Sequence, residues 1–346
     1  MGRRVLESAY ELSNSGPNAQ GAGATLGQLL DEWLQECERL DLSPTTIRNY
    51  KSQVERAIRP RLGKVPLSAL TAKHLDDLYG PLKGAGKSPK TIRNIHAVLS
   101  AALHQGVRWG WLKQNPADMA KPPRVAHTKV HAPTTETVKK VIAAAEDRDP
   151  RLAPLLMLAA LTGMRRGELC ALRWNDVDLE AGVITVSRSL IVAVGGLAEK
   201  STKTDRSRKV ALDPVGVSLL VDHRNRVDGW AEQAGATLPD DAFVFSPFVE
   251  ATTPFRPDNV TNFFIRVRND VGAPGVRLHD LRHFTATQLI GAGVDVRTVA
   301  GRLGHADPSI TLRVYADVIE ERDRAAAVVM GQVLAPSTKQ AAAAGS

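Results

Sequence analysis

The chain has 346 residues, enough for two domains, and 43% of them are hydrophobic, which suffices for ordinary globular cores. Its formal net charge of +8 favours a polyanionic partner, and nucleic acid before a membrane surface. No apolar run reaches membrane-spanning length, and the opening MGRRVLESAYELSNSG lacks the apolar core of a signal peptide. Cys37 and Cys170 fall inside helical patterns and are expected to be free thiols. These features argue against a secreted or membrane protein and predict a soluble, cytoplasmic one.

The first part of the chain changes character at Thr25. Residues 1–24 include the stretch SNSGPNAQGAGA, which lacks periodicity and predicts a flexible lead-in. Residues 25–112 show helical periodicity and predict a small all-α domain. Its helices are expected near residues 25–40, 45–59, 71–82 and 88–108.

Two of these helices begin with nearly the same phrase, SPTTIRNY at residues 43–50 and SPKTIRNI at residues 88–95. In both, Ser suits the N-cap and Pro the first helical position. The repeat is explained equally well by two well-capped helices or by helix starts that contact DNA phosphates. Arg48 and Arg93 are the DNA-binding candidates on the second interpretation.

Residues 113–135 form the predicted linker, with four prolines and four Lys or Arg residues. Pro122 and Pro123 cannot continue a helix, so a stiff, basic connection is expected. Its Lys121 and Arg124 are further candidates for contacts to a phosphate backbone.

A second domain is predicted over residues 136–334, followed by a disordered Ala-rich tail at residues 335–346. The runs GVITVSRSLIVAV and RKVALD are expected to be strands of a small antiparallel sheet. Helices surround them, near residues 135–147, 151–162 and 166–173 and again after Asp213. The fold class is therefore mainly α, with a helical first domain and an α+β second domain.

Two motifs of the second domain place cations for anion binding. In TGMRRGEL, either Arg165 or Arg166 can bind an anion, and Glu168 lies three residues after Arg165, on the same side of a helix. In HDLRH, His279 and Arg282 lie three residues apart and can address one phosphate. His283 is expected to lie behind them and to be structural.

The HDLRH motif also resembles the zinc-protease signature HExxH, which makes a zinc hydrolase an alternative. Two features disfavour it. Arg282 would put a fixed positive charge between the two metal ligands, and Asp280 is shorter than the glutamate that acts as base.

Three further motifs complete a possible site. Lys203 lies in TKTDRS between the two predicted strand regions, with Lys200 as its competitor. His305 follows in LGH, and Tyr315 comes ten residues later in TLRVYAD. Guanidinium groups match a phosphodiester and stay charged, and a tyrosine hydroxyl in such a field can attack phosphorus.

In this order and with these flanks, the motifs resemble the tyrosine recombinase (phage integrase) family, over roughly residues 25–334. The resemblance implies a SAM-like core-binding domain and a catalytic domain, the choice of Arg165 over Arg166, and a lysine on a β-turn that protonates the leaving oxygen. It also implies a covalent 3′-phosphotyrosine and a free 5′-hydroxyl. Such a reaction conserves the bond energy, so no metal and no nucleotide cofactor is expected.

The expected partners follow from the same resemblance. They are double-stranded DNA attachment sites, a homotetramer that assembles on DNA, and an accessory protein for direction or bending. An apolar stripe near the end of the chain has to be buried, either on its own catalytic domain or on a neighbouring protomer. The stripe comprises Ala326, Val329, Met330, Val333 and Leu334.

The resemblance leaves alternatives and one departure. One alternative is a type IB topoisomerase, which uses the same tyrosine chemistry on DNA. Another is a DNA-binding regulator that has lost its catalytic site, which is harder to reconcile with a chain in which all six motif residues are present. Longer integrases carry an arm-site-binding domain before the core-binding domain, and the residues before Thr25 are too few for one.

Overall fold

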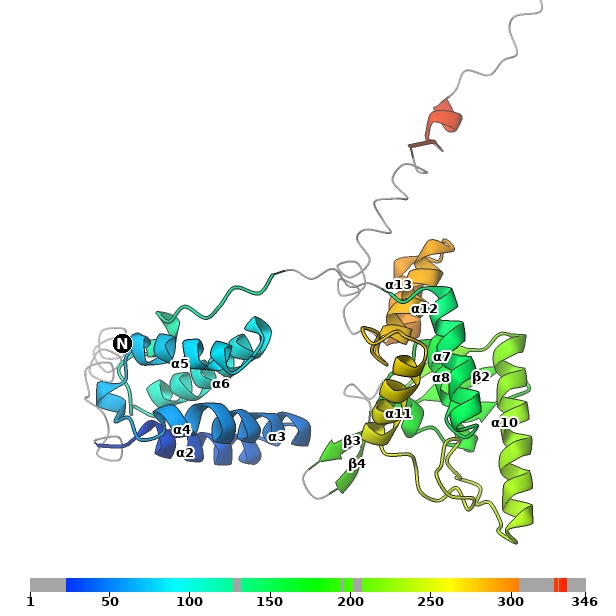
Figure 1. Ribbon diagram of the computed structural model, residues 1–346, viewed down its shortest axis with the longest axis horizontal. Coiled ribbons are helices and arrows are strands. Elements are labelled where there is room, and N and C mark those ends of the chain that lie inside the picture. Colours follow the sequence, from blue (N-terminus) through cyan, green and yellow to red (C-terminus); the bar gives the residue numbers. More distant parts are fainter. Residues whose placement is uncertain are drawn as a thin grey trace, which may run out of the picture. The chain divides into compact units, whose positions relative to one another are not determined.

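The computed structural model describes residues 23–126, 132–193, 196–201, 207–304, 327–328 and 330–334. The chain divides into two compact units, Met1–Thr128 with Ala193–Gly195, and Lys129–Val192 with Gly196–Ser346. Both are dominated by helices (Figure 1). Lys203, His305 and Tyr315 lie outside the described residues, as do Ala326 and Val329 of the apolar stripe.

The first unit is a helical bundle built around α6 (Pro89–Arg108), which packs against α2 (Leu26–Arg39), α3 (Pro44–Gln53) and α5 (Ala72–Gly84). Thr25 caps α2 through a reciprocal pair of hydrogen bonds with Gln28. Apolar positions at helical spacing, among them Leu29, Leu30, Ile92 and Leu99, are buried between the helices. The predicted helical domain is therefore present.

The helix expected near residues 45–59 is longer and contains an irregular turn. It continues through a π-helical stretch, Val54–Ile58, into α4 (Arg59–Leu62). Pro60 lies at the junction and has no amide hydrogen for the ordinary helical ladder, which is a standard cause of such an irregularity.

The repeated Ser-Pro phrase starts a helix in both places, but the two serines differ. The Ser88 hydroxyl accepts a hydrogen bond from the Thr91 amide at 3.2 Å and caps α6. The Ser43 hydroxyl makes no cap bond and instead contacts the hydroxyls of Thr45 and Thr46.

The beginning of the Pro-rich stretch 113–135 packs on the first unit. The Asn115 side chain donates to the Ser100 carbonyl at 3.3 Å, ahead of a 3₁₀ turn at Pro116–Asp118. The Lys121 amide donates to the Asp76 carboxylate of α5 at 2.7 Å. Helix α7 begins at Thr135.

The second unit is arranged around α8 (Ala153–Thr162), a helix with apolar residues on all sides. It contacts α7 (Thr135–Arg148), α9 (Arg166–Cys170), α10 (Pro214–Gln233) and α12 (Asp280–Gly291). Helix α11 (Pro257–Asp270) packs on α7 and α9, and α13 (Val296–Leu303) packs on α12 (Figure 1).

Helix α9 is shorter than the expected 166–173. It ends at Cys170 because the following backbone pairs with a distant segment: the Val244 amide donates to the Leu172 carbonyl and the Trp174 amide donates to the Ala242 carbonyl. A long-range pairing of this kind overrides local helix propensity.

The strands form two small sheets. The first is antiparallel, with the order β1 (Val177–Asp178), β2 (Val183–Val186), β5 (Arg208–Ala211), and the second pairs β3 (Arg188–Ala193) with β4 (Gly196–Ser201). The apolar run expected to be one strand region thus divides at Ser187 between the sheets. The predicted fold class, mainly helical with a small antiparallel sheet, is confirmed.

None of the described helices is both long enough and apolar enough to cross a membrane. Near the end of the chain, residues 327–328 and 330–334 are helical, and Met330, Val333 and Leu334 are exposed.

Candidate active site

Arg165 lies at the junction between α8 and α9, at the N-cap of α9. Helix α8 ends at Gly163, whose φ of +67° is in the left-handed region. A Cβ at this position would lie 2.4 Å from Leu303 Cδ2, so glycine is required for both conformation and space. Thr162 and Gly163 therefore end α8 just before Arg165, and the missing side chain of Gly163 lets Leu303 of α13 pack against this turn.

Glu168 lies under Arg165 and is 3% exposed. Its carboxylate accepts hydrogen bonds from the Arg165 amide at 2.8 Å and from Arg165 Nη1 at 2.9 Å. Burial opposes ionisation of Glu168, but Arg208 and Arg165 outweigh it and lower its pKa below the usual range. Glu168 therefore orients Arg165 from beneath.

Arg282 projects from α12 and is 3% exposed. Its Nη1 donates to the carbonyl of Gly163 at 2.8 Å and to that of Leu303 at 2.6 Å. One guanidinium thus joins the end of α8 to the end of α13.

Three arginines donate to three consecutive carbonyl groups at the end of α13. The pairs are Arg208 Nε with Arg302 O at 3.0 Å, Arg282 Nη1 with Leu303 O at 2.6 Å, and Arg165 Nη2 with Gly304 O at 2.8 Å. We call this set the arginine clamp. Terminal carbonyls have no partners within their helix and carry partial negative charge, so guanidinium groups stabilise them. The clamp thereby fixes the backbone that leads directly into His305.

Gly304 is a second glycine that the site requires. Its φ is +70°, and a Cβ there would lie 2.8 Å from Arg208 Nη1. The Gly in LGH therefore leaves room for the arginine clamp.

His279 lies immediately before α12 and is exposed to solvent. The surrounding protein, His283, and the charges of Arg282 and Arg165 lower the pKa of His279 to about 4. The imidazole is therefore neutral near pH 7 and able to accept a proton.

His283, expected to lie behind His279 and Arg282 and to be structural, is in contact with the His279 ring. The two rings contact each other edge to face, with centroids 5.0 Å apart. Residues four apart lie on the same side of a helical turn, which is the physical reason. His283 is half-buried and supports the position of the His279 ring.

Arg166, the alternative to Arg165, points elsewhere. Its Nη1 donates to the Thr261 hydroxyl and lies 3.8 Å from the Asp258 carboxylate, both on α11. It makes no contact with the arginine clamp among the hydrogen bonds of the described residues.

Arg208 is the site residue that sequence reasoning missed. Its neighbour Lys209 is exposed, whereas Arg208 is partly buried. The available signal was strand alternation: Val210 is buried, so Arg208 lies on the same inward face of β5 and Lys209 on the other.

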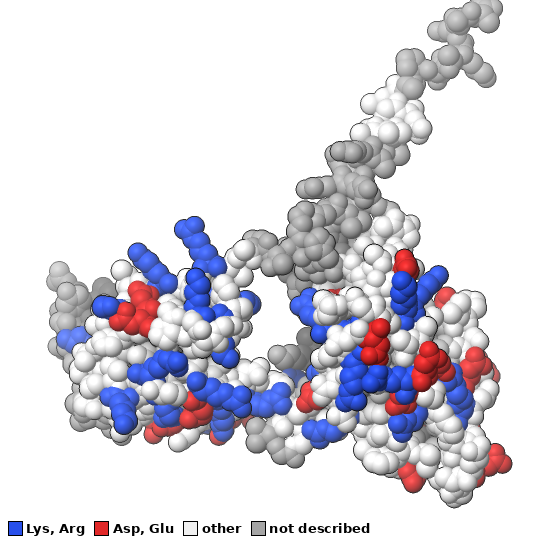
Figure 2. Space-filling view, viewed as in Figure 1, with Lys and Arg blue, Asp and Glu red and all other residues white. Residues whose placement is uncertain are grey.

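The basic residues expected to contact DNA are all on the surface. Arg48 on α3, Arg93 on α6, Lys121 and Arg124 are exposed. Figure 2 shows Lys and Arg side chains spread over the visible face, with Asp and Glu among them. Within the described parts of the chain, no three His, Cys, Asp or Glu side chains gather as metal ligands.

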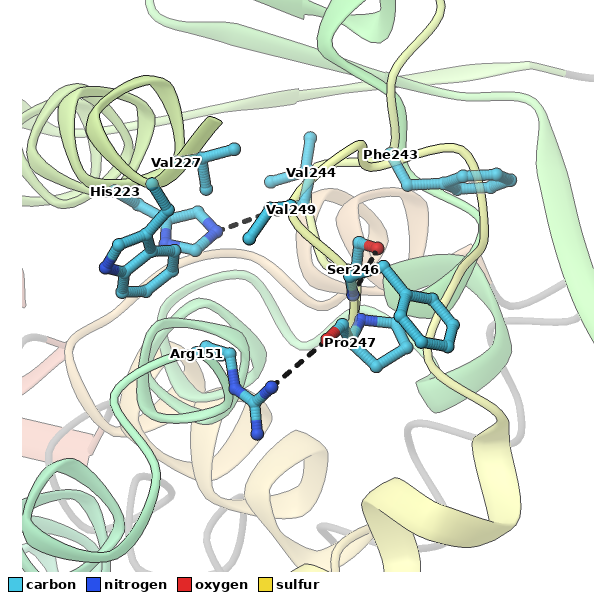
Figure 3. Close-up of a pocket in the computed structure, with 10 residues that line it drawn as sticks. Arg151, His223, Val227, Phe243, Val244, Ser246, Pro247 and Val249 are labelled. Atoms are coloured by element: carbon cyan, nitrogen blue, oxygen red, sulfur yellow. Dashed lines mark hydrogen bonds between the residues drawn. The ribbon is translucent and has the colours of Figure 1, made fainter. Parts of the chain in front are cut away.

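A pocket of about 240 Å³ lies apart from these residues (Figure 3). It is lined by Val227, Trp230, Phe248 and the buried His223, whose Nε2 contacts the Val244 carbonyl at 2.7 Å. None of the predicted site residues lines it.

Comparison with known proteins identifies the class. Residues 133–322 match the model of the phage integrase family, and residues 25–82 match the phage integrase N-terminal SAM-like domain. A XerC-like tyrosine recombinase of Caldanaerobacter subterraneus is 30% identical, over 89% of this chain and 83% of that protein. The ICEBs1 integrase of Bacillus subtilis is 27% identical, over 86% of this chain and 80% of that protein.

Solved structures show the same fold. The Tn1549 transposon integrase in complex with a circular intermediate DNA superimposes with a TM-score of 0.72 at 20% identity, covering 87% of this chain and 99% of that one. A lambda integrase tetramer bound to a Holliday junction gives 0.65 at 21% identity, covering 84% and 77%.

The architecture is therefore that of an integrase, with a SAM-like core-binding domain followed by a catalytic domain. The chain belongs to the phage integrase family of tyrosine recombinases, enzymes that cleave and rejoin DNA.

The low pKa of His279 gives a first prediction. In the DNA-free protein, the His279 imidazole should stay neutral down to about pH 4, and a bound phosphate should raise its pKa through its negative charge. Because the folded-state pKa is lowered, the unfolded chain binds more protons below about pH 6.5, and stability should fall as the pH drops through that window. Histidine NMR titration with and without bound DNA, with His279→Gln to assign the signal, measures the two pKa values of His279. A pKa near 6.5 in the DNA-free protein would contradict the prediction.

Proposed function

We propose that this enzyme is a site-specific recombinase that integrates or excises phage or mobile-element DNA through a 3′-phosphotyrosine on Tyr315. The observation that carries the proposal is the convergence of Arg165 and Arg282 on adjacent carbonyls at the end of α13, directly before His305. Two fixed positive charges in one place suit the developing charge of a phosphoryl-transfer transition state.

The proposed chemistry assigns one task to each group. The Tyr315 oxygen attacks phosphorus, the bond from phosphorus to the 5′-oxygen breaks, and the enzyme becomes linked to the 3′-phosphate. Neutral His279 accepts the phenolic proton, and Lys203 donates a proton to the departing 5′-oxygen. Arg165, Arg282 and His305 stabilise the non-bridging oxygens. Rejoining is the reverse attack by a 5′-hydroxyl of the partner strand.

The first unit and the linker are proposed to bind DNA without adding chemistry. Exposed Arg48 and Arg93 lie near the starts of α3 and α6, where backbone amides also favour phosphate. Lys121 and Arg124, which follow in the sequence and are exposed, are proposed to add further contacts to phosphates. Each contact should contribute affinity that weakens with salt.

The test begins by sequencing the junctions formed in a host that carries the protein, which defines the attachment sites. Purified protein should then exchange strands between two DNAs that bear these sites, in excess EDTA and without nucleotide. Relaxation without exchange would indicate topoisomerase-type activity instead. Loss of activity that zinc restores would indicate a metal enzyme built on His279 and His283.

Assembly gives a second prediction, which concerns the apolar stripe. We propose that it docks on a neighbouring protomer, because Met330, Val333 and Leu334 are exposed and a free apolar stripe is unfavourable in water. Met330→Asp with Val333→Asp should leave half-site binding intact and abolish paired-site complexes in native gels. Gln332→Asp, outside the stripe, is the matched control. Unfolding of the double variant would instead indicate packing on its own domain, and normal synapsis would contradict the proposal.

A further inference from the structure

Arg208 is the member of the arginine clamp that the recombinase motifs do not include. Its Nη1 and Nη2 donate to both oxygens of Glu168, at 3.0 and 2.6 Å, and its Nε donates to the Arg302 carbonyl at 3.0 Å. The Arg208 side chain is 14% exposed and that of Glu168 is 3% exposed. One largely buried guanidinium thus joins Glu168 on α9 to the end of α13.

The surroundings of Glu168 show why this contact matters. Arg165 contacts the carboxylate from one element and Arg208 from another. Asp176 and Arg188 border the same small space, but they form their own ion pair at 2.6 Å. Arg208 and Arg165 therefore balance the buried charge of Glu168, and Arg165 is 43% exposed. Without Arg208, burial would favour the protonated carboxyl, which accepts hydrogen bonds from Arg165 more weakly.

The strand that carries Arg208 has a fixed register. Arg208 pairs with Val186 of β2 in the antiparallel ladder, and it lies five positions after Lys203 in the sequence. The start of β5 is thereby tied to Glu168 and to the end of α13.

We propose that Arg208 is a positioning residue for strand cleavage, which aligns Glu168 under Arg165 and fixes the end of α13. The inference rests on the roles proposed above for Arg165 and His305. Arg208 need not touch DNA in this role, so its loss should slow cleavage far more than it weakens binding.

The test is single-turnover formation of the covalent adduct on a nicked duplex that carries the mapped core site, from about pH 6 to 9. Arg208→Gln should slow cleavage at least about tenfold at the acidic end and recover as the pH rises, because Glu168 then ionises. Glu168→Gln should be slow at every pH. In the Glu168→Gln background, Arg208→Gln should cost clearly less than in the parent, because the shared interaction is already lost and only the contact with the Arg302 carbonyl remains. Arg208→Lys, which keeps the charge, should restore part of the rate.

Arg302→Gln is the matched control. Arg302 contacts the Ala211 and Leu161 carbonyls beside the same helix end without contacting Glu168. The loss of Arg302 should lower the cleavage rate by the same factor at every pH from about 6 to 9. A rate loss in Arg302→Gln that is confined to acidic pH would overturn the inference. Fully additive effects of Arg208→Gln and Glu168→Gln on the cleavage rate would overturn it too. An active Arg165→Ala enzyme would instead overturn the proposed site itself.

Discussion

Arg165→Ala should slow strand cleavage by about 100- to 1,000-fold, the range for removal of one preorganised donor from a transition-state site. Binding should fall only modestly, because many phosphate contacts share the affinity. Arg165 is the exposed member of the arginine clamp, at 43%, so its loss should disturb folding less than the loss of a buried partner. Adduct formation on a nicked duplex and gel shift of the same DNA measure the two effects.

Arg166→Ala is the natural control for this experiment. It removes the neighbouring guanidinium, whose contacts are with Thr261 and Asp258 rather than with the clamp. Cleavage by this variant should stay close to that of the parent. A parallel loss of binding and cleavage in Arg165→Ala would reduce Arg165 to a docking contact, and a larger loss in Arg166→Ala would exchange the roles.

Arg282→Ala should lose cleavage to a similar extent and also lose stability. Its Nη1 donates to two buried carbonyls, and leaving buried acceptors without partners costs about 1–3 kcal/mol. Arg282→Lys keeps a charge but cannot reproduce the planar guanidinium, so it should recover part of the stability and little of the rate. Thermal unfolding measured beside cleavage separates the two losses.

Local signals predicted the elements that local physics determines. Thr25 and Ser88 mark helix starts because their side chains satisfy the first free amides. The TG pair marks the end of α8 because a left-handed residue is needed there. Such features depend on a few neighbouring residues, so the sequence alone is sufficient to find them.

The parts that were missed depend on contacts between distant segments. The clamp joins Arg165, Arg208 and Arg282 to one helix end, and no local pattern relates these positions. The early end of α9 likewise depends on pairing with residues near 243. The contact of His283 with His279, by contrast, follows from helical spacing alone.

Tyr315→Phe should bind DNA normally and form no covalent adduct, because phenylalanine lacks the attacking oxygen. The chain has four tyrosines, and the structure describes two of the others, Tyr50 and Tyr79. The Tyr79 hydroxyl contacts His96 Nδ1 at 2.7 Å, and burial raises the pKa of Tyr79 to about 12, so its oxygen is a poor nucleophile near neutral pH. Tyr50 is stacked on Trp33, with ring centroids 5.0 Å apart, within the helical bundle.

Tyr50→Phe is therefore the matched control: it removes one phenolic oxygen and keeps the stacked ring. It should form the adduct at the rate of the parent, whereas Tyr315→Phe should show none on a denaturing gel after long incubation with the nicked duplex. Mapping the DNA-linked peptide of the parent enzyme then identifies the nucleophile directly. A persistent adduct in Tyr315→Phe, or a linked peptide that contains Tyr50 or Tyr79, would place the reaction in a different part of the chain and separate it from Arg165 and Arg282.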